Sequence, residues 1–284
     1  MKRHSIQGVV EISSAGPGPR VVIMGGIHGN EPCGVKAVER LERDFRSGVL
    51  SIARGTLLLV VANEEALRAD VRSVHRNLNR LFKDNSDEPD CYETRRAEEL
   101  KEILASADFV LDLHSTTSAS PPFLMCENDG LPAARSLGLD RIVLGWASLE
   151  SGALSGDTES WARQHNATAF TLECGQHNDP AAAEVAYQAA SQFLGVTGLV
   201  DAPPQSLNRD PLILRLYEVK LKVDESFAFS KSYSGFDSLS QGEVIGRDSH
   251  GEYRVERPSR IIFPIDPAKA SIGTELYLLA EEMS

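Results

Sequence analysis

Short apolar runs alternate with helix-length stretches between residues 20 and 198 of this chain. Most of these runs are continuously apolar, which is typical of central strands that are covered on both faces. We predict strands at residues 21–26, 56–62, 109–113, 122–125, 141–144 and 168–173, and helices at residues 31–46, 92–106, 157–165 and 180–193. This order of elements predicts an α/β fold with a mixed, largely parallel sheet flanked by helices.

The pattern changes after residue 198. Residues 199–211 contain Pro203, Pro204 and Pro211 but few large apolar side chains, so we interpret this segment as a linker. Short β-rich runs follow at residues 212–223, 243–246, 252–255, 260–263 and 275–280, with glycine-containing turns between several of them. We therefore expect two domains: residues 1–198 carry the α/β sheet, and residues 199–284 form a small all-β domain.

The net charge of −12 argues against a nucleic-acid partner, because binding to phosphates needs a basic face. No apolar stretch approaches the roughly 18–20 residues that span a bilayer, and the N-terminus lacks the apolar segment of a secretory signal. The four cysteines have no C-x-x-C spacing, which favours reduced thiols. We expect a cytoplasmic protein with no membrane or nucleic-acid partner; the sequence leaves a homo-oligomer open.

The segment GGIHGNEP, residues 25–32, follows the first apolar strand. Ligand-binding residues in open α/β sheets gather at the C-terminal ends of the strands. His28 and Glu31 would supply an imidazole nitrogen and a carboxylate oxygen there, both of which bind Zn²⁺. An isolated H-x-x-E pair is often incidental, but the flanking glycines and the position at a strand end favour a metal site.

A catalytic zinc site usually has three protein ligands and one open position, so a third ligand is needed. His114 ends the strand FVLDLHST, and Asp112 lies two residues earlier on the same face, where it would orient a ligand. The alternative is a hydrogen-bonded core histidine capped by Ser115 and Thr116. His177 competes for the ligand role, because it follows the strand that ends at residue 173.

Glu173 closes the apolar strand TAFTLE. A carboxylate at the end of a buried strand is costly unless it is paired or functional. Next to a metal site it would act as general base towards water and would then protonate the leaving amine. A structural ion pair is the alternative interpretation.

The segment RSVHRNLNRLF, residues 72–82, follows the strand at residues 56–62 and begins at the same sheet edge as the other candidates. Arg72, Arg76 and Arg80 lie in it, together with Asn77 and Asn79. A guanidinium group can hold a carboxylate through two parallel hydrogen bonds, and a second can polarise a carbonyl and stabilise an oxyanion. A solvated basic loop is the alternative.

Together, GGIHGNEP, the R-x4-N-L-N-R run, DLHST and TLE resemble the succinylglutamate desuccinylase/aspartoacylase family, part of the zinc carboxypeptidase-like group. The resemblance covers roughly residues 20–195 in order, and the β-rich C-terminal region also fits. It implies a zinc carboxypeptidase-like fold and an amidohydrolase with one Zn²⁺ per chain. The implied substrate is a small anionic N-acyl amino acid.

The resemblance also implies roles for individual residues. The implied zinc ligands are His28, Glu31 and His114. Glu173 matches the catalytic glutamate, and Arg72 matches the arginine that polarises the scissile carbonyl. Asn79 and Arg80 match the pair that holds the α-carboxylate of the amino-acid moiety. His177 then has no ligand role.

Two departures from the family pattern leave the acyl group open. Family members usually have an aspartate two residues before the Asn-Arg pair, where this chain has Asn77. The segment at residues 149–166 has no tyrosine and one arginine, Arg163, so it matches no residues that fix an acyl or side-chain carboxylate. Two alternatives remain: a zinc carboxypeptidase for short peptides, and a catalytically inactive relative that binds a metal or ligand. The C-terminal β region is expected to close over the cleft.

Overall fold

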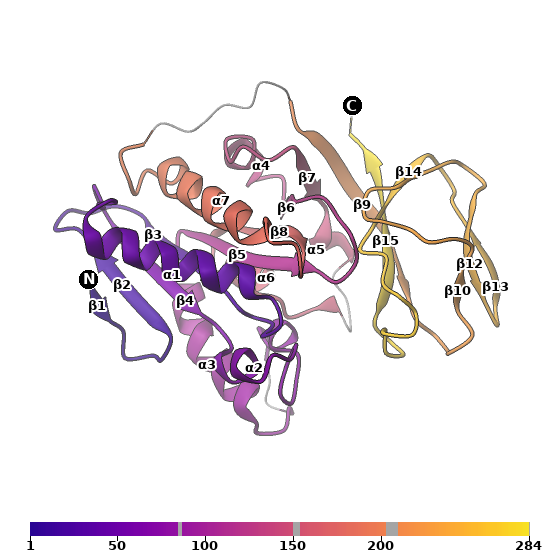
Figure 1. The fold of residues 1–284 in the computed structure, drawn as a ribbon, viewed down its shortest axis with the longest axis horizontal. Coiled ribbons are helices and arrows are strands. Elements are labelled where there is room, and N and C mark those ends of the chain that lie inside the picture. The colour runs from indigo at the N-terminus through magenta and orange to yellow at the C-terminus, as the bar shows by residue number, and fades with distance from the viewer. Residues whose placement is uncertain (85–86, 150–153, 203–209, 284) are drawn as a thin grey trace.

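The computed structural model describes residues 1–84, 87–149, 154–202 and 210–283 (Figure 1). Part of the predicted linker, residues 203–209, lies outside the described residues. The predicted strands of the α/β part are all present, as β3 (Arg20–Gly25), β4 (Thr56–Val61), β5 (Phe109–Thr116), β6 (Phe123–Cys126), β7 (Arg141–Leu144) and β8 (Thr168–Gln176). The predicted helices are present as α1 (Pro32–Ser47), α3 (Tyr92–Ala105), α6 (Thr158–Gln164) and α7 (Ala182–Val196).

Several short elements before residue 198 were not predicted. They are β1 (Lys2–Arg3), β2 (Val9–Ser13), α2 (Glu64–Ala69), the 3-10 helix η1 (Leu78–Arg80), α4 (Leu131–Ala134) and α5 (Trp146–Leu149). Most of them lie between the predicted elements, so they leave the α/β order unchanged.

The main sheet of the described chain has the strand order β1-β2-β4-β3-β5-β8-β6-β7-β9-β15-β14-β11. Its centre, β4-β3-β5-β8, is parallel throughout, whereas β6 runs antiparallel to β8. The sheet is therefore mixed, with helices on its faces, as the sequence predicted.

The helices explain why the central strands are continuously apolar. Alternate residues of β3 point to opposite faces: Val21 and Ile23 pack with residues of α1 and α7, and Val22 and Met24 pack with residues of α3 and α6. Figure 1 shows α1 and α7 next to each other on one face of the sheet. Both faces of these strands are thus buried in a core.

The C-terminal region is all-β, as predicted. Its strands are β9 (Leu212–Leu221), β10 (Ala228–Phe229), β11 (Ser238–Leu239), β12 (Val244–Asp248), β13 (Gly251–Arg254), β14 (Ser259–Ile262) and β15 (Glu275–Glu282). β9 pairs in parallel with β7, so the main sheet continues into this region, and β10, β12 and β13 form a separate small sheet. The domain boundary after residue 198 falls between α7 and β9 and stays a prediction. None of the described helices is long and apolar enough to cross a membrane.

The N-terminal end of α1 lies unusually close to the sheet. A Cβ atom on Gly34 would lie 2.6 Å from the carbonyl oxygen of Leu113, and one on Gly25 would lie 2.4 Å from the carbonyl carbon of Gly34. Glycine at both positions lets the backbones of β3, α1 and β5 touch. This approach brings Glu31, the residue before α1, to the end of β5.

Candidate active site

Three predicted metal ligands converge at the C-terminal end of the parallel strands. His28 lies in the loop after β3, Glu31 immediately precedes α1, and His114 lies near the end of β5. One ligand atom from each residue lies within 4.8 Å of the others, and their exposed fractions are 3%, 2% and 3%. The structure therefore brings the three side chains together in a buried cluster, while their role as ligands stays a prediction.

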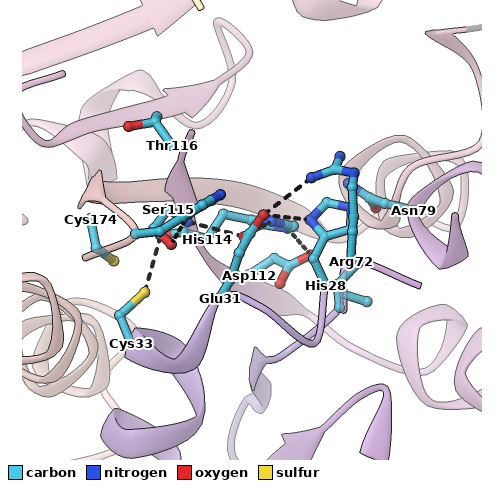
Figure 2. A network of polar contacts seen from close by, with 12 residues as sticks. His28, Glu31, Cys33, Arg72, Asn79, Asp112, His114, Ser115, Thr116 and Cys174 are labelled. Carbon is cyan, nitrogen blue, oxygen red and sulfur yellow. Dashed lines mark hydrogen bonds and ion pairs between the residues drawn. The ribbon is translucent and has the colours of Figure 1, made fainter. Parts of the chain in front are cut away.

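The Glu31 carboxylate lies between the two imidazole rings (Figure 2). Its Oε1 atom is 2.8 Å from Nδ1 of His28, and its Oε2 atom is 3.0 Å from Nδ1 of His114. Arg72 donates from Nη1 to Oε1 at 3.3 Å, and the backbone N–H of Ser115 donates to Oε2 at 3.1 Å. Both histidines thus present the same ring nitrogen, Nδ1, to one carboxylate.

The other nitrogen of each ring faces an oxygen atom. Nε2 of His28 lies 3.0 Å from Oδ1 of Asn77. Nε2 of His114 lies 3.0 Å from Oδ2 of Asp112, close enough for an ion pair although the two atoms do not have hydrogen-bond geometry. Metal-ligating histidines characteristically have such an oxygen partner on the second nitrogen, because it fixes the ring and its tautomer.

Burial and the neighbouring charges set the protonation of this cluster. Burial lowers the pKa of His28 to about 4. Burial also raises the pKa of Glu31, but the charge of His28 and the hydrogen bonds from both histidines outweigh this and hold that pKa well below its usual range. Burial lowers the pKa of His114, yet the charge and contact of Asp112, and then Glu31, hold it well above its usual range. An ionised carboxylate between two imidazoles fits the donor set of a Zn²⁺ site.

Glu173 lies beside this cluster. In the parallel pairing of β5 and β8 it is in register with His114, so both side chains leave the sheet on the same face. Glu173 is 8% exposed, and its Oε2 atom has no hydrogen-bond partner among the described residues. Burial raises the pKa of its carboxyl group to about 8, although the charge of His114 acts in the opposite direction. No ion pair explains this buried carboxyl group within the described chain, which leaves the structural alternative without support.

The Asn-Arg pair lies in η1. The Oδ1 atom of Asn79 accepts a hydrogen bond of 3.1 Å from the backbone N–H of Thr158, which leaves the amide NH2 group to donate elsewhere. Arg80 donates from Nη1 to the carbonyl oxygen of Asn79 at 2.7 Å and pairs through Nη2 with Glu275 of β15 at 2.7 Å. Arg76 instead pairs with Glu88 at 2.9 Å.

One cavity of about 150 Å³ joins these groups. Its lining includes all the predicted site residues: His28, Glu31, Arg72, Asn79, Arg80, His114 and Glu173. The C-terminal region contributes Phe263, Ile265, Glu275 and Leu278 to the same wall. The cavity therefore lies between the ends of the parallel strands and the all-β region, where the sequence led us to expect a cleft.

Residues 17–196 match the model of the family described as "Succinylglutamate desuccinylase/Aspartoacylase catalytic domain". The chain belongs to the succinylglutamate desuccinylase/aspartoacylase family. A curated succinylglutamate desuccinylase from Serratia proteamaculans is 30% identical over 287 residues, which cover 92% of this chain and 85% of that relative. The family predicted from the four motifs is thus confirmed, and its desuccinylases indicate an amide-hydrolysing enzyme.

Solved structures agree with this fold. The succinylglutamate desuccinylase from Vibrio cholerae has a TM-score of 0.80 at 24% identity and covers 97% of this chain and 86% of its own. A succinylglutamate desuccinylase/aspartoacylase from Rhodobacter sphaeroides has a TM-score of 0.76 at 19% identity, with coverage of 97% and 89%. At these identities the similarity shows the fold, and it confirms the predicted fold class.

Two other polar residues considered from the sequence lie outside the cluster. The Nδ1 atom of His177 is 2.8 Å from Oγ of Ser115, and its Nε2 atom is 3.3 Å from Oγ1 of Thr117. Arg163 pairs with Asp129 at 3.2 Å and is not among the described residues that line the cavity. In this structure its guanidinium group is therefore occupied by Asp129.

Sequence reasoning missed part of the cavity wall. The missed polar and aromatic lining residues include Trp146, Asp157, Glu159 and Thr171. Thr171 had a usable signal, because it lies two residues before Glu173 on the same face of its strand. The side chains at the start of α6 had no such signal, because the sequence does not show which end of a helix meets the cavity.

Proposed function

We propose that this family member is a zinc-dependent deacylase that hydrolyses the amide bond of a small N-acyl amino acid. One observation carries the proposal: the buried His28–Glu31–His114 cluster lines the same cavity as the carboxyl group of Glu173, whose Oε2 atom has no partner among the described residues. The family's desuccinylases remove an acyl group from an amino acid, and that chemistry suits this set of residues.

The donor set favours one Zn²⁺ per chain, held by His28, Glu31 and His114. Two imidazole nitrogens and one carboxylate oxygen are a common set of three protein ligands at catalytic zinc sites, which keep one position open. When bound, the metal supplies a Lewis acid that polarises the acyl carbonyl and makes water more acidic. His114 has to give up its proton to bind the metal, so we expect proton release on loading.

Glu173 is the proposed general base and acid. It accepts a proton from the attacking water and delivers it to the nitrogen of the departing amine. Arg72 is half exposed, at 49% of its side chain, and lines the cavity with one nitrogen on Glu31. Its remaining N–H groups are available to the carbonyl oxygen, where negative charge develops as the water attacks.

Asn79 and Arg80 are the proposed anchor for the α-carboxylate of the substrate. Asn79 is pre-oriented by Thr158, and Arg80 is fixed by Asn79 and Glu275. Donors that are already fixed reduce the entropy that is lost when the substrate binds. They also hold the amide bond next to the catalytic groups.

A carboxypeptidase acting on short peptides is the second candidate, because a peptide also presents a carboxylate beside an amide. The desuccinylases among the relatives favour the N-acyl amino acid over the peptide. An inactive metal-binding relative is disfavoured by the presence of both Glu173 and Arg72 in the cavity. The cytoplasmic location and a homo-oligomeric state stay predictions.

The test is a comparison of N-acetyl and N-succinyl amino acids with dipeptides, using protein loaded with one zinc per chain. We expect hydrolysis of at least one class of N-acyl amino acid and its loss after chelation, with recovery on reloading. If dipeptides are cleaved faster than N-acyl amino acids, the protein is a peptidase rather than a deacylase. Stoichiometric zinc without hydrolysis of either class would support the inactive relative.

A further inference from the structure

Carboxyl groups outnumber guanidinium groups around the cavity. Among the described lining residues, the carboxyl groups belong to Glu31, Asp157, Glu159, Glu173 and Glu275. The guanidinium groups belong to Arg72 and Arg80, and each is already in contact with a carboxylate, Glu31 and Glu275 respectively. The cavity thus offers little positive charge beyond what a metal would bring.

Most of these carboxyl groups have a clear structural or proposed chemical task. The Oδ1 atom of Asp157 accepts from the backbone N–H of Ser160 at 2.8 Å, and its Oδ2 atom accepts from Nε1 of Trp146 at 2.9 Å. Glu31 belongs to the metal cluster, Glu275 holds Arg80, and Glu173 is the proposed base. Glu159 is the carboxyl group without such a task.

Glu159 is deeply buried and poorly satisfied. It is 4% exposed, and its Oε2 atom accepts one hydrogen bond of 3.1 Å from Oγ1 of Thr171. Its Oε1 atom accepts no hydrogen bond from the described residues, and it forms no ion pair with them. Arg163, one turn further along α6, pairs with Asp129 instead. Burial, and then the charge of Asp157, raises the pKa of Glu159 well above its usual range.

Apolar side chains line the same cavity as this carboxyl group. They are Met125, Trp146, Phe263, Ile265 and Leu278. In such surroundings a lone charge is costly and a complementary charge is strongly favoured, because little water can screen either one. An ammonium group brought by a ligand would favour the ionised form of Glu159 and supply its missing partner, whereas a carboxylate would bring a second unpaired acidic group into the same apolar surroundings.

We propose that Glu159 selects substrates: it favours N-acyl amino acids whose side chain ends in an ammonium group and disfavours those with a second carboxylate. This inference rests on the proposed deacylase function, with the α-carboxylate held by Asn79 and Arg80. A succinyl group or a glutamate side chain would add a second carboxylate, and both guanidinium groups of the described lining already have proposed tasks, Arg80 at the α-carboxylate and Arg72 at the scissile carbonyl. The preferred substrate is therefore a short, uncharged acyl group on a diamino acid.

The test compares three Nα-acetyl amino acids with similar side-chain lengths: ornithine, norvaline and glutamate. For the zinc-loaded protein we expect kcat/KM for acetylornithine to exceed that for acetylglutamate by about 100-fold, since a buried charge contact changes binding by about 10- to 100-fold. Glu159→Gln should lower kcat/KM for acetylornithine by about 10-fold or more and change that for acetylnorvaline by less than about threefold. Glu184→Gln, on the exposed surface of α7, is the matched control and should change none of the three.

Calorimetric binding of the free amino acids ornithine and glutamate gives a second measurement that does not depend on turnover. Glu159→Gln should weaken ornithine binding and leave glutamate binding equal or tighter. If the unaltered protein hydrolyses acetylglutamate as fast as acetylornithine, or faster, the proposed selection by Glu159 is wrong while the deacylase function stands. If Glu159→Gln lowers kcat/KM equally for all three substrates, Glu159 has a structural role, and this result would also overturn the proposal. Absence of hydrolysis of every acyl amino acid would instead overturn the proposed function.

Discussion

The Nε2 atom of His28 lies 3.0 Å from the Oδ1 atom of Asn77, and the same oxygen accepts a hydrogen bond of 3.0 Å from the backbone N–H of Asn79. A single carboxamide oxygen thus contacts both a candidate metal ligand and the first residue of the candidate substrate anchor. Because an amide oxygen only accepts, it stabilises the His28 tautomer that carries its proton on Nε2, the form in which Nδ1 gives up its hydrogen bond to Glu31 and can bind a metal. The Nδ1 lone pair then faces the site where a metal would bind.

The identity of residue 77 should therefore tune the affinity for zinc. Asn77→Asp keeps the acceptor and adds a negative charge, so we expect zinc to bind about tenfold more tightly. Asn77→Leu removes the acceptor and should weaken zinc binding by about 10- to 100-fold. Competition with a chromophoric chelator measures both effects, and Asn166→Asp on the exposed turn after α6 is the control. Unchanged affinity in Asn77→Leu would show that His28 needs no such partner.

Much of this fold was accessible from the sequence, because the central strands are buried on both faces and so read as continuous apolar runs. Thr56–Val61 and Arg141–Leu144 were found to within one residue at each end. Val9–Ser13 was missed, because it lies near the sheet edge and has partly exposed residues within a short run. The pairing of β7 with β9 was also out of reach, since periodicity identifies strands but not their distant partners.

The site was predictable to the extent that its residues lie at strand ends. His28, His114 and Glu173 follow or end apolar runs, and parallel strands place those ends at one edge. Glu159 and Trp146 come from short helices whose exposed and buried faces the sequence does not distinguish. Their place in the cavity depends on how α5 and α6 pack, which only the structure shows.

Replacing Glu173 by glutamine should separate catalysis from metal binding. The amide cannot accept the proton from water, so we expect kcat to fall by about 10²- to 10⁴-fold. Zinc content should stay at one per chain, because Glu173 is not among the clustered metal-ligand candidates. Steady-state kinetics and metal analysis on the same sample test this. Turnover near that of the unaltered protein, with zinc bound, would assign the base to another residue.

The ionisation of Glu173 should also make the stability of the metal-free protein depend on pH. The pKa of Glu173 lies at about 8 in the folded chain against an ordinary value of 4.5, so folding favours the protonated form. Its contribution to stability is complete below about pH 4.5 and is lost as the pH rises through about 8, by at most about 1.4 kcal/mol per pH unit. Glutamine cannot ionise, so Glu173→Gln should remove this part of the pH dependence of the free energy of unfolding.

Urea unfolding of the metal-free unaltered protein and of metal-free Glu173→Gln between pH 5 and pH 8 measures this difference in pH dependence. Glu173→Gln should gain stability relative to the unaltered protein as the pH rises. Subtracting the two curves cancels the titration of the other groups where these are independent of Glu173. Curves that stay parallel over this range would mean that Glu173 is already ionised in the folded chain.

The close approach of α1 to β5 leads to the last prediction, for Gly34→Ala. The added Cβ atom would lie 2.6 Å from the carbonyl oxygen of Leu113 and 2.8 Å from its Cβ atom, so backbone rather than a flexible side-chain end has to move. We expect a loss of about 1–3 kcal/mol in the free energy of unfolding, the usual cost of overpacking. Glu31 immediately precedes α1, so any shift of the helix also separates the carboxylate from His114 and should weaken zinc binding. Gly16→Ala, where an added Cβ atom meets nothing within 4 Å, controls for the change of glycine to alanine. If Gly34→Ala loses stability but keeps full zinc affinity, the glycine contact serves packing alone, and Glu31 is positioned by its hydrogen bonds to His28, His114 and Ser115.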